Sequence, residues 1–411
     1  MTSETLLYLL LAIITFDFVL ELVLDILNLN YQKDELPQEL KDVYDAEKFK
    51  RSQEYLKANT RFGFITSTFS YLTMVVVLYF GWLGWLDIFV KLTFSNSIVQ
   101  SLAFFAALFL ISDLLGTPFA LYKVFVIEEK FGFNKTTVKT FFTDKLKSYL
   151  LAFILGGIIL AALLWLVKEM GQNFWIWFWI VISVFILLVN LFYTSLILPL
   201  FNKLIPLEQG DLRVAIENYT KKVNFPLTNI FVMDGSKRSN KSNAFFSGIG
   251  REKKIVLFDT LIQNHTQAEL VAVLAHEAGH YKKHHIMQGM IVSIFQTGLI
   301  LYLLSWFIFN GELSYALGGV QSSIHLNLIA FFMLFSPISH ITGILANIWS
   351  RKNEYEADRY ASETYSAQAL ESALKKLSAD NLSNLTPHPA HVFVHYSHPP
   401  LLQRLRALEK K

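Results

Sequence analysis

Cysteine is absent from the 411 residues of the chain. Its absence excludes disulfides, thiolate metal ligands and cysteine nucleophiles, so any bound transition metal must be held by histidine and carboxylate side chains. A strong excess of one charge is also lacking, because the formal net charge is only +3. The basic residues lie in loops rather than on one aromatic-lined face, so the sequence predicts no nucleic-acid partner.

Apolar residues dominate what is present. They make up 53% of the chain, and the mean hydropathy is +0.39. Apolar runs of about 20 residues recur, which is the length of a helix that crosses a bilayer. We therefore predict an all-α polytopic membrane protein with seven transmembrane helices. These helices are expected near residues 5–28, 63–90, 98–122, 149–167, 175–201, 286–309 and 326–349.

Lysine and arginine indicate how the predicted helices are oriented. They are frequent in residues 29–62 and 123–148 and absent from residues 310–325. Because cytoplasmic loops carry the excess of Lys and Arg, the N-terminus should face out and the C-terminus should face the cytoplasm. The first helix has neither the basic start nor the cleavage site of a signal peptide, so we expect it to be retained.

The orientation divides the chain into four regions, two of which are polar enough for soluble structure. Short β-prone runs at 229–234, 243–248 and 254–258 predict a small sheet, and hence an α+β metalloprotease domain on the cytoplasmic side. The regions are a five-span part at 1–201, a cytoplasmic metalloprotease part at 202–285, a two-span hairpin at 286–349 and a cytoplasmic tail at 350–411 that completes the active site.

The motif His276-Glu277-Ala278-Gly279-His280 lies near the end of a predicted helix at 266–285. Thr266 and Glu269 form the capping-box pattern that starts such a helix. Two histidines four residues apart lie about 40° apart around a helix, so both imidazoles can reach one metal ion. Glu277 is then placed to take a proton from metal-bound water. The motif predicts a zinc site that still needs a third ligand.

The run from Ser350 to Asp358 follows the last predicted span and also has helical character. Glu354 is the best third ligand. Asp358 lies four residues later on the same face, so it could accept the free imidazole N–H of a ligand histidine. Glu356 is expected to point to the other side. The alternative for this run is a solvated helix with surface ion pairs.

Acidic residues also occur inside the predicted membrane region. Asp17, Glu21 and Asp25 recur every four residues and form a stripe on one face of the first span. Acids at such depth normally face water or the interior of a helix bundle, so we predict a hydrated interior. The alternative is that Glu21 and Asp25 lie at the membrane interface. Other histidines are expected to be interfacial (His284, His285) or packing or loop residues (His325, His340), and no metal site is predicted at His388, His391 and His395, where binding would only be adventitious.

The chain resembles the type 1 CAAX prenyl proteases, which are seven-span integral-membrane zinc metalloproteases of the gluzincin kind. The resemblance runs nearly end to end and implies a water-containing chamber enclosed by the helices. Besides the metal motif and the run to Asp358, it rests on Glu128–Lys135, Asp234–Ser239, Ser242–Phe246 and Tyr396–Leu405.

The resemblance also implies roles for individual residues. One zinc ion would be held by His276, His280 and Glu354, with Glu277 as general base and acid. Asn243 and His398 would flank the cleft and contact the substrate backbone and the developing oxyanion. Taken alone, Asn243 would be a turn residue, and His398 would be either a donor to the oxyanion or a helix cap before two prolines.

The leading hypothesis is a zinc endopeptidase that cleaves near the C-terminus of lipid-modified or membrane-associated proteins at the cytoplasmic face. In the family this is the release of the last three residues after a prenylated cysteine. One alternative is a quality-control protease of the HtpX-like kind. Another is an ion transporter or channel with a structural zinc site, although two histidines and one glutamate leave a position open for water, which a structural site normally does not.

The remaining expectations concern the setting of the protein. Its partners should be the bilayer and its protein substrates, and it should work as a monomer. The short connection at 310–325 favours a bacterial inner membrane. In a eukaryote, the resemblance implies the endoplasmic reticulum.

Overall fold

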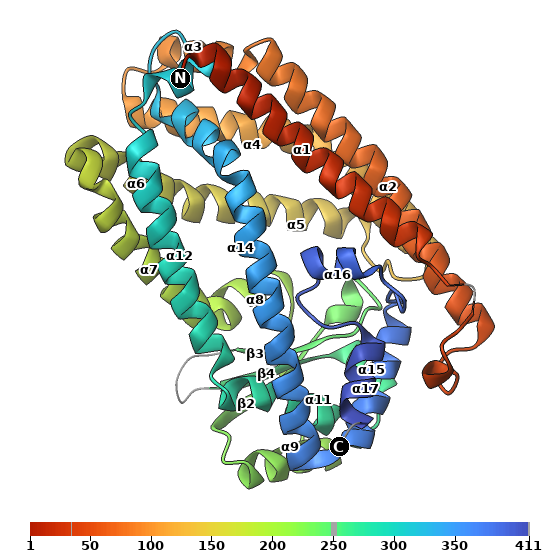
Figure 1. Ribbon diagram of the computed structural model, residues 1–411. Helices are drawn as coiled ribbons and strands as arrows, with labels where there is room; N and C mark the ends of the chain where they lie inside the picture. Colours follow the sequence, from red (N-terminus) through yellow and green to blue (C-terminus); the bar gives the residue numbers. More distant parts are fainter. Residues whose placement is uncertain (34, 248–252, 410–411) are drawn as a thin grey trace.

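The computed structural model describes residues 1–33, 35–247 and 253–409. Figure 1 shows long helices at the end that holds the N-terminus and a small sheet with shorter helices at the end that holds the C-terminus. Six helical segments of the described chain are long and apolar enough to cross a membrane. The prediction of a predominantly helical, polytopic membrane protein is therefore confirmed.

The apolar helices form most of the first 201 residues and return after the sheet. They are α1 (Ser3–Asn30), α2 (Ala46–Tyr79), α3 (Trp82–Thr93), α4 (Ser97–Tyr122), α5 (Val138–Leu151), α6 (Gly157–Met170), α7 (Phe174–Phe192), α8 (Leu198–Phe201), α12 (His285–Phe307), α13 (Gly311–Ala316) and α14 (Ile324–Ala361). Short π-helical segments extend α4 and join α5 to α6 and α7 to α8.

The predicted span at 63–90 is wrong in its bounds. The helix α2 already begins at Ala46 and ends at Tyr79, and α3 follows it. The break lies at Gly81, whose φ of 65° is a left-handed conformation that glycine adopts at little cost. The chain needs this turn because α3 packs very closely on the loop after α13: a Cβ on Gly84 would lie 1.8 Å from the carbonyl oxygen of Gly318.

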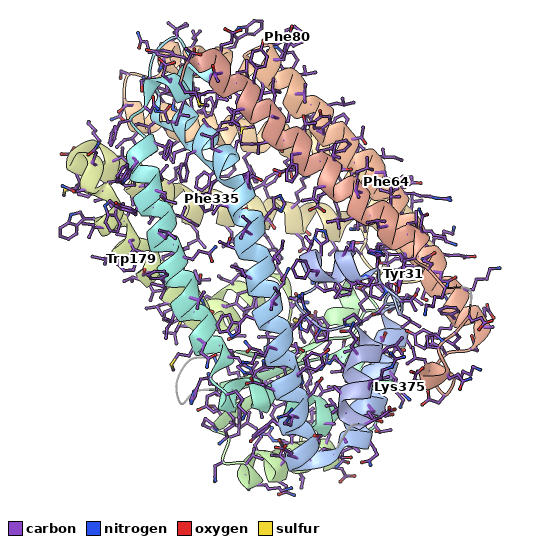
Figure 2. The ribbon with its side chains drawn as sticks, in the orientation of Figure 1. Tyr31, Phe64, Phe80, Trp179, Phe335 and Lys375 are labelled. Atoms are coloured by element: carbon purple, nitrogen blue, oxygen red, sulfur yellow. The ribbon has the colours of Figure 1, made fainter. Side chains whose placement is uncertain are left out.

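Apolar side chains of α7, α12 and α14 pack together. Phe335 of α14 belongs to the same cluster of buried residues as Leu301 and Leu304 of α12 and Phe178 of α7. The indole N–H of Trp179 on α7 donates to the carbonyl of Ile294 at 2.8 Å. Figure 2 labels Phe335 and Trp179 in this part of the molecule. This packing holds the first half of α14, whose second half carries part of the site described below.

The sheet has four strands, with β2 and β4 parallel at its centre and antiparallel strands at both edges in the order β1-β2-β4-β3. The three predicted runs correspond to β2, β3 and β4, although Gly248 lies outside the described residues. The first strand was not predicted, because it has only three residues and ends in proline. The strands are β1 (Leu204–Pro206), β2 (Leu227–Met233), β3 (Ala244–Ser247) and β4 (Lys253–Phe258).

The helix that carries the histidine motif packs directly on this sheet. It is α11 (Gln267–Lys282), and the capping box of Thr266 and Glu269 is formed as predicted. Leu270 and Leu274 are both 2% exposed, and burying each stabilises the fold by about 2 kcal/mol. The other helices of this part are α9 (Asp211–Lys222), α10 (Asp259–Asn264), α15 (Ala367–Asp380), α16 (Pro389–His395) and α17 (Leu401–Glu409).

Candidate metal centre and active site

The helices α11 and α14 approach closely at Gly279. A Cβ at this position would lie 2.9 Å from the Cα of Ala357 and 3.1 Å from its carbonyl oxygen. Ala278 and Ala357 are also buried at this contact. The small side chains let the two backbones come together, which brings Glu354 of α14 beside the histidines of α11.

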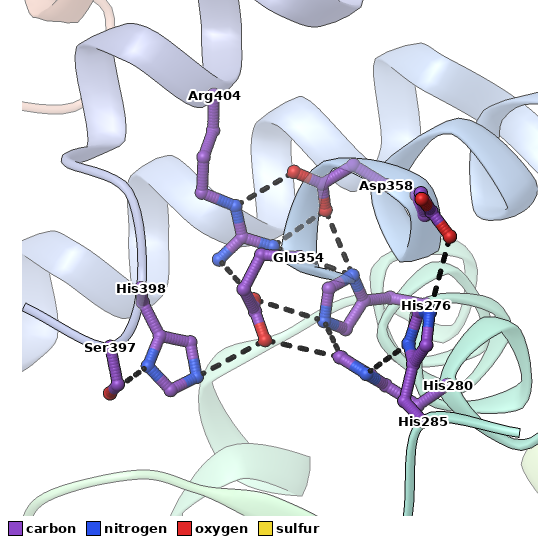
Figure 3. Close-up of polar contacts among 9 residues, drawn as sticks. His276, His280, His285, Glu354, Asp358, Ser397, His398 and Arg404 are labelled. Atoms are coloured by element: carbon purple, nitrogen blue, oxygen red, sulfur yellow. Dashed lines mark hydrogen bonds and ion pairs between the residues drawn. The ribbon is translucent and has the colours of Figure 1, made fainter. Parts of the chain in front are cut away.

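Three side chains converge where these helices meet (Figure 3). The atoms of His276, His280 and Glu354 that could bind a metal ion all lie within 4.8 Å of one another. The two Nε2 atoms are 3.2 Å apart. The Glu354 oxygens lie 3.5 Å from Nε2 of His276 and 3.2 Å from Nε2 of His280.

This arrangement fits a divalent metal ion. One carboxylate oxygen of Glu354 is buried and accepts no hydrogen bond from the residues that the structure describes, although buried polar atoms normally have a partner. Two imidazoles and one carboxylate form a ligand set that suits zinc and leaves one position for water. The sequence prediction placed these three residues in one site, and the structure brings them together.

Asp358 and Arg404 support the first histidine from behind. The Asp358 Oδ1 atom accepts from Nδ1 of His276 at 2.8 Å, so a ring that loses its other proton offers the Nε2 lone pair on the side of Glu354. Arg404 holds Asp358 with two hydrogen bonds of 2.8 and 2.6 Å. Sequence reasoning proposed Asp358 but assigned no role to Arg404. The pairing joins α14 to α17. In the sequence, the only indication of this region was that the run Tyr396–Leu405 belongs to the family resemblance.

Glu277 lies on the next position of α11 and lines a cavity of about 340 Å³ together with the three convergent residues. Burial raises the pKa of the Glu277 carboxyl above its ordinary value. A carboxylate with a raised pKa is a better proton acceptor at neutral pH than an exposed one. The cavity thus places a candidate base next to the candidate metal ligands.

Asn243 and His398 line the same cavity. Nε2 of His398 lies 3.4 Å from Glu354 and its ring is 64% exposed, so it is available to a substrate. Asn243 is exposed just before β3, the edge strand, and its side-chain oxygen accepts from the N–H of Ala244 at 2.9 Å. The structure therefore gathers six predicted site residues around one cavity.

Comparison with known proteins places this arrangement in a family. The model of the CAAX prenyl protease N-terminal region, described as five membrane helices, matches residues 25–203, and that of peptidase family M48 matches residues 206–411. The CAAX prenyl protease 1 homolog of Oryza sativa is 37% identical, over 91% of this chain and 90% of its own length.

Two further relatives agree with this match. CAAX prenyl protease 1 of Saccharomyces cerevisiae is 36% identical, over 92% of this chain and 90% of its own length. The crystal structure of S. mikatae Ste24p is 34% identical, covers 98% of this chain and 99% of its own, and superposes with a TM-score of 0.93. The chain belongs to the CAAX prenyl protease 1 family of M48 metallopeptidases. The predicted resemblance is thus confirmed, and the protein is a membrane metalloendopeptidase.

In this CAAX prenyl protease family member, the acidic stripe of α1 does not line the cavity and instead contacts three histidines. Nε2 of His340 on α14 lies 3.2 Å from Asp17. The remaining two acids meet α16: Glu21 is 3.1 Å from His395 and Asp25 is 3.4 Å from His391. These pairings were not predicted, although both the acids and the histidines of α16 have the spacing of one helix face.

The expectation that His285 is an interfacial residue is wrong. The residue is 6% exposed, and its Nδ1 lies 3.1 Å from Nδ1 of His280. Glu356 does not line the cavity, but its Oε2 lies 3.3 Å from Nε2 of His285 and thus contributes to the same network. Only His284 is exposed as expected. The chain turns between α11 and α12 at the left-handed His284. Helical spacing alone does not predict such a turn.

Proposed function

We propose that this protein is a zinc-dependent endopeptidase that removes the last three residues of prenylated CAAX proteins. The observation that carries the proposal is the convergence of His276, His280 and Glu354 beside Glu277 in one cavity. The relatives named above are CAAX prenyl proteases by name, which supports the substrate class. We propose one zinc ion per chain.

The residues of the cavity divide the reaction between them. His276, His280 and Glu354 would hold the zinc ion, which would supply Lewis-acid chemistry to the scissile carbonyl and make the attacking water more acidic. Glu277 would take a proton from the attacking water and deliver it to the leaving amine. Partial desolvation of the ring lowers the pKa of His398, which favours a neutral imidazole with one N–H to offer the oxyanion. Asn243, at the start of the edge strand, would contact the substrate backbone.

The proposed membrane arrangement has seven spans around a hydrated interior. The continuous helical segment Val138–Phe201 counts as one of the six apolar segments, but Gly171 within it has a φ of 54°. Leu163 and Val167 of α6 pack with Phe174 and Phe178 of α7 across this turn, which supports a hairpin of two spans. The partly exposed Asp17, Glu21 and Asp25 support water inside the bundle.

The setting of the active site remains a proposal as well. We place the site on the cytoplasmic side, with regions 202–285 and 350–411 forming the metalloprotease part and regions 1–201 and 286–349 forming the membrane part. The absence of a nucleic-acid partner and a monomeric state also stay predictions, as does the choice between a bacterial inner membrane and the endoplasmic reticulum.

A cleavage assay with purified protein tests the function. A farnesylated peptide that ends in a CAAX sequence should lose its last three residues, and its unprenylated twin should be cleaved much more slowly. Glu277→Gln should retain zinc, measured by elemental analysis, and lose cleavage, whereas Glu354→Ala should lose both. Equal rates on the two peptides would favour the quality-control alternative. Peptidase activity that persists in Glu277→Gln would refute the assigned base.

A further inference from the structure

The second ligand histidine has an outer partner that the proposed reaction does not use. His285 is buried behind His280, and their Nδ1 atoms are 3.1 Å apart. On its other side, Nε2 of His285 lies 3.3 Å from Oε2 of Glu356. The three side chains therefore form a row that starts at the ligand set and ends at a carboxylate that is 40% exposed.

The positions of the protons in this row follow from which nitrogen atoms must donate and which must accept a hydrogen bond. Nε2 of His280 faces the other ligands and must keep its lone pair to bind a metal, so Nδ1 of His280 carries the proton and donates it. The facing Nδ1 of His285 then accepts. Its own proton lies on Nε2, from which it donates to the Glu356 carboxylate. This assignment satisfies both hydrogen bonds with neutral imidazoles.

We propose that His285, itself held by Glu356, is a positioning residue that fixes the tautomer and ring orientation of His280 for metal binding. The inference rests on the proposed metal centre. Each of the two ligand histidines then has a carboxylate of its own behind it, and both carboxylates belong to α14. Asp358 of α14 contacts His276 directly, whereas Glu356 of α14 acts on His280 through His285.

The local backbone explains how His285 reaches this place. The helix α11 ends at Lys282, and α12 begins at His285. Between them His284 has a φ of 59°, a left-handed conformation that interrupts the helix and turns the chain. After this turn the ring of His285 lies against His280 in the last turn of α11, while His284 is exposed.

This geometry supplies a matched control. His284→Asn alters a neighbouring histidine without touching the row, and asparagine tolerates the left-handed conformation better than most residues. His285→Ala removes the acceptor for His280, and Glu356→Ala removes only the far end of the row. The double variant His285→Ala/Glu356→Ala tests whether Glu356 acts through His285 or by itself.

The experiment measures zinc affinity of the purified full-length proteins by competition with a chelator, and the visible absorption of the cobalt-substituted proteins. Loss of an outer partner typically lowers metal affinity by about 10- to 100-fold. We expect a loss of this size in His285→Ala, with a changed cobalt spectrum, and a change of less than about twofold in His284→Asn. Glu356→Ala should weaken binding less, and it should add nothing in the His285→Ala background.

The outcomes separate this inference from the proposed function. A wild-type protein that binds no zinc would refute the metal centre, and the inference with it. If wild type binds zinc and His285→Ala binds it as tightly as His284→Asn does, the positioning role alone is overturned. Additive losses in the double variant would also overturn it, because Glu356 would then act independently. Thermal melting of the metal-free proteins detects misfolding, and Glu356→Ala decides the question if His285→Ala does not fold.

Discussion

Replacement of Gly279 by alanine tests whether the close approach of α11 and α14 sets the metal geometry. The new Cβ would lie 2.9 Å from the Cα of Ala357, whereas ordinary contacts begin at 3.4 Å. The helices must therefore separate by about 0.5 Å, because backbone atoms cannot turn away. Metal sites require ligand distances within about 0.2 Å. We expect zinc affinity to fall at least about tenfold, since Glu354 moves away with α14.

The cost in stability should be smaller than the loss of metal affinity. Overpacking costs about 1–3 kcal/mol, while alanine is about 1 kcal/mol better than glycine inside a helix, so the net loss is about 0–2 kcal/mol. Chelator competition measures zinc binding, and tryptophan fluorescence follows thermal unfolding. Gly289→Ala is the control, because no heavy atom lies within 4 Å of its added Cβ. The reasoning fails if Gly279→Ala binds zinc as tightly as Gly289→Ala.

Three further substitutions or titrations are expected to give measurable changes. Arg404→Lys loses the two-point contact with the carboxylate behind His276 and should lower zinc affinity about tenfold, whereas Arg406→Lys, at an exposed ion pair on the same helix, should not. Burial raises the pKa of Glu269, but hydrogen bonds led by that of Lys376 outweigh it and lower the pKa to about 2. The ionised Glu269 therefore stabilises the folded protein fully above pH 4.5, and this contribution is lost as the pH falls toward 2. In Glu269→Gln, the melting temperature should depend less on pH over this acid range. Burial lowers the pKa of His276, but hydrogen bonds to carboxylates outweigh this and raise the pKa to about 9. Because zinc must displace this proton to bind, zinc affinity should rise between pH 7 and 9. A zinc affinity that stays constant over this range in the chelator competition would contradict this.

Local patterns made much of the site predictable. The capping box at Thr266 fixed the start of α11, and the helical spacing of His276 and His280 determined which face they share. Glu354 and Asp358 could be added because they too lie four residues apart on one helix. These inferences used the geometry of single helices, the chemistry of their side chains and, for Glu354, the loop charges that place the tail on the same side of the membrane as the motif.

Contacts between elements could not be predicted in the same way. Arg404 reaches Asp358 from another helix, and His285 reaches His280 only because His284 is left-handed. The pairing of Asp17 with His340 likewise joins residues far apart in the sequence. Such contacts depend on chain reversals and helix packing, which leave no periodic signal. The break at Gly81 was missed because apolar residues continue on both sides of it.

The length of α14 makes the bilayer part of the alignment of the active site. This one helix contains an apolar stretch long enough to cross a membrane, Pro337 and the proposed ligand Glu354. Glu354 lies 17 residues beyond Pro337, a lever arm of about 25 Å at 1.5 Å per residue. A tilt of about 2° at the proline would move the carboxylate by about 0.9 Å, several times the tolerance of a metal site. Bilayer thickness, which acts on helix tilt, would then influence metal coordination without any contact between lipid and ligand.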